Sequence, residues 1–195
     1  ARALSTGYND TPDAASRPWD KGRDGFVMGE GGGVVLLEEL EHAKARDARI
    51  YCEIAGYGNT ADAHHMTAPA PEGEGGARAM RMALKSGGLN PENISYINAH
   101  GTSTPQGDVC ETQAIKNVFG NNLPKISSTK SLTGHSLGAT GVHEAIYCLL
   151  MLNNNFLCGS ANITNLDESA QNYNILLETE GNDKIENVLS NSIGF

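Results

Sequence analysis

The residues best suited to chemistry are a histidine and the hydroxyl side chains after it, in residues 98–108. A short apolar run, residues 94–97, leads directly to His100, and three hydroxyl-bearing residues follow: Thr102, Ser103 and Thr104. A buried strand that ends at a histidine and continues into a turn-rich loop would hold the imidazole at the edge of a sheet, beside short hydrogen-bond donors. A strand-to-helix turn with a structural histidine explains the same residues, because residue type alone does not establish a site.

A second histidine stretch, residues 127–141, adds a cation. It contains Lys130, His135 and glycines at positions 134, 138 and 141. The presence of two such stretches favours a site over a lone structural histidine.

Alternating helices and strands are expected to position these loops. We expect helices at residues 38–46, 73–86, 108–118 and 142–152, the last one buried and the third capped by Asp108. Gly87 and Gly88 are expected to end the second helix. The predicted strands are 34–37, 50–57, 94–97 and 125–128, with shorter pieces at 163, 175–177 and 188–189. This alternation predicts a layered α/β fold in a single domain, residues 1–195.

Composition excludes several classes of function. The 14 basic and 23 acidic side chains give a formal charge of −9 without a basic cluster, which argues against nucleic-acid binding. No apolar run approaches the roughly 20 residues of a membrane helix, so we expect a cytoplasmic protein with reduced thiols. Neither the scattered cysteines nor the adjacent His64 and His65 have the spacing of a metal site. The glycines at 29–33 precede an apolar run instead of following one, which excludes a dinucleotide loop.

The two histidine stretches resemble the histidine loop and the lysine–histidine loop of the β-ketoacyl-[acyl-carrier-protein] synthases, the condensing enzymes of fatty-acid synthesis. Residues 16–20, 23–31 and 190–195 support the resemblance, which runs in order over nearly all 195 residues. Residues 62–67 are more similar to synthase II than to synthase I. The resemblance implies a thiolase-like fold, an α-β-α-β-α sandwich of two similar halves, with this chain as the C-terminal half, truncated at both ends.

The resemblance also implies roles for single residues. His100 and His135 would polarise the thioester carbonyl of malonyl-carrier protein and stabilise the enolate that forms when carbon dioxide leaves. Lys130 would pair with Glu111 and hold both histidines in their working tautomer, with Asp108 as a further support. Thr102 and Thr104 would bind the pantetheine arm. At the acyl-pocket gate, Ile193 stands where the family usually has phenylalanine, two residues before Phe195.

The implied partners follow from the same resemblance. They are acyl-carrier protein, which brings the phosphopantetheine arm as part of the substrate, and an N-terminal half that supplies the nucleophilic cysteine. The complete synthase would be a homodimer without a bound cofactor or metal. None of the cysteines at 52, 110, 148 and 158 lies in a nucleophile motif, so we expect the isolated chain to be inactive.

Two alternatives remain. Residues 134–138, Gly-His-Ser-Leu-Gly, fit the nucleophile elbow of serine hydrolases, with Ser136 as nucleophile. That motif requires a strand directly before it and then an acid and a histidine in that order, and neither condition is met here. The other alternative is an inert structural half that folds against a partner.

Overall fold

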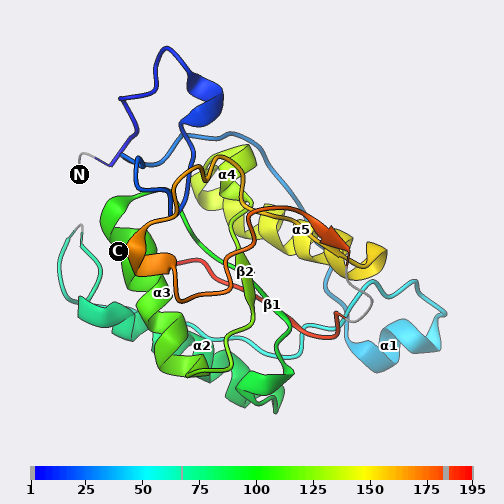
Figure 1. Cartoon of the computed structure of the whole chain (residues 1–195). Coiled ribbons are helices and arrows are strands. Elements are labelled where there is room, and N and C mark those ends of the chain that lie inside the picture. Colours follow the sequence, from blue (N-terminus) through cyan, green and yellow to red (C-terminus); the bar gives the residue numbers. More distant parts are fainter. Residues whose placement is uncertain (1–2, 67, 182–184, 195) are drawn as a thin grey trace.

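The computed structural model describes residues 3–66, 68–181 and 185–194 and places helices around a small parallel sheet (Figure 1). The central strand β1 (Tyr96–Asn98) pairs in parallel with β2 (Lys125–Ser127) and with β5 (Val188–Ser190). In this register Ile97 lies opposite Ile126 and Leu189. Strands β3 (Phe156–Leu157) and β4 (Glu180–Gly181) form a separate antiparallel pair.

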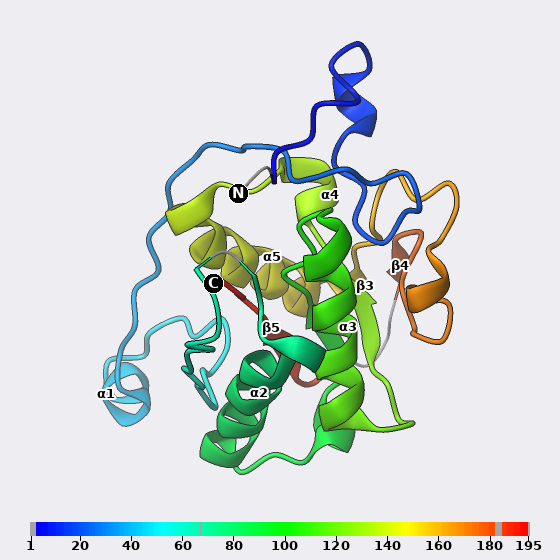
Figure 2. The same cartoon turned by 90° about the vertical axis from the view of Figure 1, so that its left-hand side faces the viewer.

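The α-helices cover both faces of the parallel sheet. In chain order they are α1 (Leu40–Ala45), α2 (Glu74–Gly87), α3 (Pro105–Phe119), α4 (Lys130–Thr133) and α5 (Thr140–Asn154). Figure 2 shows α2 and α3 packed together in front of the strands, with α5 behind them. Short 3₁₀ helices lie at Pro12–Ala14, Pro71–Gly73, Pro91–Asn93, Leu137–Ala139 and Glu168–Ala170. Within the described ranges, no helix is long and apolar enough to cross a bilayer.

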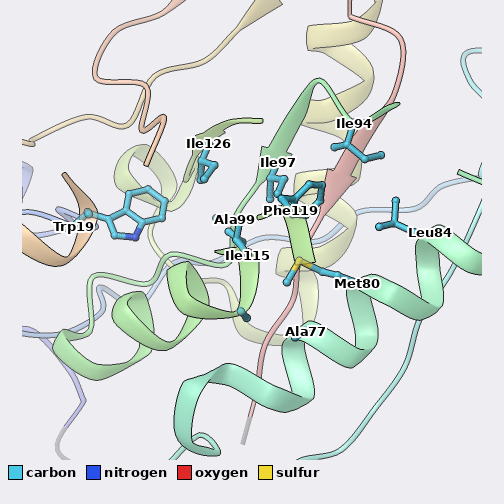
Figure 3. Close-up of a cluster of buried hydrophobic side chains, with 12 residues drawn as sticks. Trp19, Ala77, Met80, Leu84, Ile94, Ile97, Ala99, Ile115, Phe119 and Ile126 are labelled. Atoms are coloured by element: carbon cyan, nitrogen blue, oxygen red, sulfur yellow. The ribbon is translucent and has the colours of Figure 1, made fainter. Parts of the chain in front are cut away.

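Successive residues of β1 point into two different cores, because side chains alternate along a strand. Ile97 joins the cluster between the sheet and helices α2 and α3, together with Met80, Ile115 and Trp19 (Figure 3). Tyr96 points the other way and packs with buried residues around α5: Cys148, Met151, Leu157 and Leu176. The strand that leads to His100 is therefore held from both sides.

The predicted helices are largely confirmed, with shifted ends. Helix α2 buries Ala77, Met80 and Leu84 on one face and ends at Gly88, which adopts the left-handed conformation that glycine favours. Helix α3 begins at Pro105, three residues earlier than predicted, because proline suits the first turn of a helix. Asp108 therefore lies inside the first turn and is not the N-cap. Helix α5 is not fully buried, since Leu150 is half exposed.

Two predicted strands, residues 34–37 and 50–57, are wrong for this structure. Both segments are extended but form no ladder, and their apolar side chains are open to solvent, with Val34 91% and Leu36 85% exposed. They flank the peripheral helix α1 (Figure 1). A strand needs a neighbour for its backbone groups, and the described part of the chain provides none there. Residue 163 is not in a strand either, and Ile175 makes only an isolated bridge to Ile126.

Candidate active site

His100 and His135 lie together, as the sequence predicts. Their ring centres are 5.1 Å apart and the rings meet edge to face at 88°. His100 is the second residue after β1, whereas His135 follows the short helix α4 and not a strand. The backbone of His135 is held by residues 27–29: it donates to the carbonyl of Val27 (2.8 Å) and accepts from the amide of Gly29 (3.0 Å). No local motif in the sequence predicts this contact.

Glycine 134 makes that approach feasible. Its φ is +67°, and a Cβ there would lie 2.8 Å from the carbonyl oxygen of Val27. Any other residue would meet both backbone strain and a steric clash. The glycine therefore brings α4 against residues 27–29 and directs His135 toward His100.

The hydrogen bonds of His135 determine which ring nitrogen carries the proton. The backbone N–H of Leu137 donates to Nδ1 at 3.3 Å, and the hydroxyl of Thr140 lies 2.9 Å from the same nitrogen. A backbone amide can only donate, so Nδ1 accepts and the proton of the neutral ring lies on Nε2. His135 therefore presents an N–H group on its far side.

Burial and a nearby cation keep both rings neutral. Burial is the main cause that lowers the pKa of His100 well below its ordinary value, and the charge of Lys130 and the neighbouring His135 lower it further. Burial and then Lys130 also lower the pKa of His135. Nδ1 of His100 is buried without a hydrogen-bond partner among the described residues.

Lys130 pairs with Glu144 on α5, which corrects the predicted pair with Glu111. The ammonium group contacts Oε1 of Glu144, and both side chains are 1% exposed. Burial raises the pKa of Glu144 to about 7, while the lysine opposes that rise. Glu144 lies one helical turn past Thr140 and was not among the predicted site residues, because no local motif marks it.

Glu111 instead holds the backbone of the His100 loop. Its two oxygens accept from the amides of His100 (2.8 Å) and Gly101 (2.7 Å), and Asn191 donates to it at 3.1 Å. Among the described contacts, neither a hydrogen bond nor an ion pair joins Glu111 to Lys130. Burial raises the pKa of Glu111, while these hydrogen bonds, and more weakly the charge of Lys130, lower it.

Asp108 supports the same loop by a similar arrangement. Its carboxylate accepts from the amides of Ser103 (3.1 Å) and Trp19 (3.0 Å), and Nε of Arg23 lies 3.3 Å away. Ser103 and Trp19 both have positive φ, +71° and +62°, which costs a non-glycine residue free energy. Burial raises the pKa of Asp108 to about 7 against the effect of Arg23 and the amides.

The remaining predicted residues lie around these loops. Oγ1 of Thr102 and Oγ1 of Thr104 are 3.0 Å apart beside His100. Ile193 is half-buried against α2, where a Cβ on Gly76 would lie 3.1 Å from its Cδ1. Phe195 lies outside the described residues.

Burial disfavours the thiolate form of three of the four cysteines. Burial raises the pKa of Cys148 to about 12 and also raises the pKa values of Cys52 and Cys110. Cys158 is half-buried against the core around Cys148 and donates to the carbonyl of Gly159. Within the described ranges, no three potential ligands among histidine, cysteine and acidic residues gather as a metal site.

The serine-hydrolase alternative receives no support. Ser136 follows α4 and Gly134 instead of a strand, and its φ of −85° lacks the strain of a nucleophile elbow. Its hydroxyl does lie 2.9 Å from Nδ1 of His143, but no carboxylate completes a triad there among the described hydrogen bonds.

Family models match most of the chain. Residues 51–164 match the model described as the C-terminal domain of beta-ketoacyl synthase, and residues 1–43 match the model of its N-terminal domain. The chain therefore belongs to the β-ketoacyl synthase family.

Individual relatives agree with that assignment. The chain is 58% identical to 3-oxoacyl-[acyl-carrier-protein] synthase 1 of Haemophilus influenzae, over 99% of this chain and 46% of that protein. It is 56% identical to synthase 1 of Escherichia coli K12, with the same coverage. It is 51% identical to synthase 2 of Coxiella burnetii, over 100% of this chain and 47% of that protein. The chain thus spans about half the length of the curated relatives it matches.

Solved structures confirm the predicted thiolase-like α/β fold. A beta-ketoacyl synthase from Burkholderia phymatum superposes with a TM-score of 0.88 at 41% identity, covering 100% of this chain and 47% of that one. A chain from a type II polyketide acyl-carrier protein in complex with its ketosynthase superposes with a TM-score of 0.94 at 37% identity, covering 100% and 48%.

Proposed function

We propose that this chain is the part of a 3-oxoacyl-[acyl-carrier-protein] synthase that decarboxylates the malonyl group in fatty-acid elongation. The observation that carries the proposal is the pair of neutral imidazoles, His100 and His135, at 5.1 Å with Lys130 buried beside them. Two neighbouring neutral imidazoles, each able to donate one N–H, suit an oxygen on which negative charge develops.

The step assigned to these residues is an electrophilic one. The carbonyl oxygen of the malonyl thioester would accept from both Nε2–H groups. The carbon–carbon bond to the carboxylate then breaks and carbon dioxide leaves. The electron pair of the broken bond forms an enolate, whose oxygen the two histidines stabilise. The enolate carbon then attacks the carbonyl carbon of an acyl thioester, a carbon–carbon bond forms, the carbon–sulfur bond breaks and the thiolate leaves with its electron pair. The raised pKa values of Cys52, Cys110 and Cys148 do not suit them to be that thiolate, so we infer that the acyl group is carried by another part of the synthase.

The partners stay as predicted from the sequence. We infer an N-terminal half with the nucleophilic cysteine, acyl-carrier protein with its phosphopantetheine arm against Thr102 and Thr104, and a cytoplasmic homodimer without a bound cofactor. The exposed apolar segments 34–37 and 50–57 support the first of these partners. They are extended and unpaired, and the first lies within the residues that match the N-terminal family model.

A fatty-acid substrate is favoured over a polyketide. Identity is 51–58% to the curated 3-oxoacyl-carrier-protein synthases and 37% to the polyketide ketosynthase complex. The assignment to synthase II stays a prediction, since residues 62–67 favour it whereas overall identity is higher to two synthases 1. Comparing accepted acyl-chain lengths with those of the Escherichia coli synthase 1 and the Coxiella burnetii synthase 2 would decide it.

The test is a chimera in which residues 1–195 replace the matching part of the Escherichia coli synthase 1. We expect it to condense acyl and malonyl groups, and the His100→Ala and His135→Ala variants to lose decarboxylation by about 10²–10³-fold while the cysteine still accepts an acyl group. His42→Ala, on the exposed helix α1, is the matched control. A folded chimera without condensation would show that the chain is an inert structural half.

A further inference from the structure

A line of hydrogen-bonding side chains runs from His135 to a third histidine, His143 on α5. Nδ1 of His135 lies 2.9 Å from Oγ1 of Thr140, and that oxygen lies 3.3 Å from Oγ of Ser136. Oγ of Ser136 lies 2.9 Å from Nδ1 of His143. Thr140 is buried and the other three side chains are half-buried. The proposed decarboxylation gives His143 no part.

The direction of the line is decided at its two ends, because each hydroxyl has one proton. At one end, the amide of Leu137 makes Nδ1 of His135 an acceptor, so Thr140 donates to it. At the other end, a proton on Nδ1 of His143 would donate to Ser136, and Ser136 would then donate to Thr140. Without that proton, the Ser136 hydroxyl turns toward His143 and Thr140 loses its donor.

We propose that His143 is a positioning residue that donates from Nδ1 and orients this line toward His135. Hydrogen bonds in a chain polarise one another, so a donor at Thr140 strengthens the bond from Thr140 to Nδ1 of His135. That bond holds the Nε2–H tautomer and the ring angle of His135. It also draws electron density through the ring, which makes Nε2–H a better donor to an oxyanion; this last consequence rests on the proposed function.

The backbone of the glycine-rich segment fixes the place of His143 independently of the hydroxyls. A Cβ on Gly31 would lie 2.6 Å from Cε1 and 2.9 Å from Nε2 of His143, and Gly31 has φ of +152°. The bare backbone at residue 31 therefore packs against the outer edge of the ring. With that edge confined and Tyr147 on another side, at 6.4 Å between ring centres, Nδ1 stays directed at Ser136.

The direct test reads the protons on the imidazole nitrogens. In the chimera labelled with ¹⁵N-histidine, long-range ¹H–¹⁵N spectra should show His143 protonated on Nδ1 and His135 protonated on Nε2 with Nδ1 as acceptor. In the Ser136→Ala and His143→Phe variants, the Nδ1 signal of His135 should move toward that of a more weakly bonded nitrogen. The His42→Phe variant, on the distant helix α1, should leave it unchanged. An unmoved His135 signal in both line variants would overturn the proposal.

Kinetics separate positioning from general damage. Removing one hydrogen bond from the line should lower kcat of malonyl decarboxylation about three- to tenfold with little change in KM. The double variant Ser136→Ala/His143→Phe should lose no more than either single one, since both break the same line. His143→Gln, whose amide can donate to Ser136, should recover part of the rate. Additive losses, or no recovery with glutamine in a folded protein, would contradict the proposal.

The two proposals fail in different ways. If the unmodified chimera does not decarboxylate malonyl-carrier protein but the His135 signal responds to His143→Phe, the proposed function is wrong and the positioning line stands. If decarboxylation is normal and unaffected by His143→Phe, the proposed function stands and the positioning role is wrong. Labelling of Ser136 by a fluorophosphonate would show instead that Ser136 and His143 act as a hydrolytic pair, which also contradicts the positioning role.

Discussion

The two histidines face each other across 5.1 Å in surroundings that penalise a positive charge on either ring. Burial acts first and Lys130 adds to it, so protonation would place a second cation beside the buried ammonium group. A neutral ring can donate from one nitrogen while the other accepts, and at His135 the acceptor is Nδ1. The residues around the pair therefore decide which face of each imidazole a substrate meets.

The depressed pKa of His100 predicts a loss of stability in acid. Between its folded-state pKa and 6.5, the unfolded chain binds a proton that the folded chain does not, so stability falls as pH falls, by about 1.4 kcal/mol per unit. The His100→Asn variant should lack this contribution to the pH dependence of the unfolding free energy below pH 6.5. Asp108 and Glu144, with pKa values of about 7, act in the opposite direction over the same range. The measurement is therefore urea unfolding of the unmodified chain and of the His100→Asn variant from pH 6.5 to 5. Equal slopes of unfolding free energy against pH in the two proteins would contradict the prediction.

The buried pair of Lys130 and Glu144 gives a second prediction at the same scale. Lys130→Ala leaves Glu144 buried without its partner and should cost about 3–5 kcal/mol of unfolding free energy. In the chimera it should lower decarboxylation but not acylation of the cysteine. Lys130→Arg should rescue only in part, because a planar guanidinium does not replace a compact ammonium group.

A double-mutant cycle identifies the partner of the lysine. Lys130→Met combined with Glu144→Leu should be more stable than the Lys130→Met variant alone, since no charge is then left unpaired. Lys130→Met combined with Glu111→Leu should show no such recovery, because Glu111 binds backbone amides. Stronger coupling of Lys130 to Glu111 than to Glu144 would contradict the assignment.

At the scale of elements, the first two turns of α3 organise the loop before them. Asp108 and Glu111 are one turn apart and point back at four backbone amides, those of Trp19, Ser103, His100 and Gly101. Three of these amides belong to residues with positive φ: Trp19, Ser103 and Gly101. A helix that begins at Pro105 thus determines the shape of the loop that carries His100, Thr102 and Thr104.

Removing the carboxylate of Asp108 should destabilise the loop that α3 holds, and with it the folded chain. Asp108→Asn replaces an acceptor with an amide donor that faces other donors, and it leaves Arg23 without its most buried partner. We expect a loss of about 3 kcal/mol in urea unfolding. The control is Asp167→Asn, which removes the more exposed partner of Arg23 and should cost under about 1 kcal/mol. Similar losses in the two variants would show that Asp108 has no special role.

At the scale of the whole molecule, the two histidine loops are fully assembled within this chain. The sheet beside the two histidine loops is covered on both faces. Lys130 and the carboxylates of Asp108 and Glu111 are buried with these loops. Beside α1, by contrast, two extended segments leave apolar side chains in solvent. Such segments are typical of a surface that another folded part covers.

The chain alone should therefore not become acylated. Incubated with acyl-carrier protein bearing an acyl thioester, it should keep its mass, because burial raises the pKa values of Cys52, Cys110 and Cys148 and so suppresses the thiolate. Mass spectrometry checks this, with the chimera as the positive control. A stable acyl adduct on any of the four cysteines would contradict it.

Much of the molecule could be predicted from local pattern. Apolar positions one turn apart predicted α2, and glycine at its end predicted the stop. The apolar run before His100 predicted β1. The two histidine stretches each combine a histidine with turn residues beside an ordered element, and this pattern predicted that His100 and His135 lie close together. These features depend on neighbours in the sequence, so the sequence was enough to find them.

Sequence patterns did not predict which buried charges pair or which segments pair as strands, because both depend on contacts between distant parts of the chain. Lys130 pairs with Glu144 because α5 passes beside α4, while Glu111 is already bound to the amides of its own loop. Residues 34–37 have the composition of a strand but form none, because a ladder requires a neighbouring backbone and none of the described segments lies there. The type of a residue determines which interactions its side chain can form. Only the packing of the chain determines which of the competing partners lies close enough to form them.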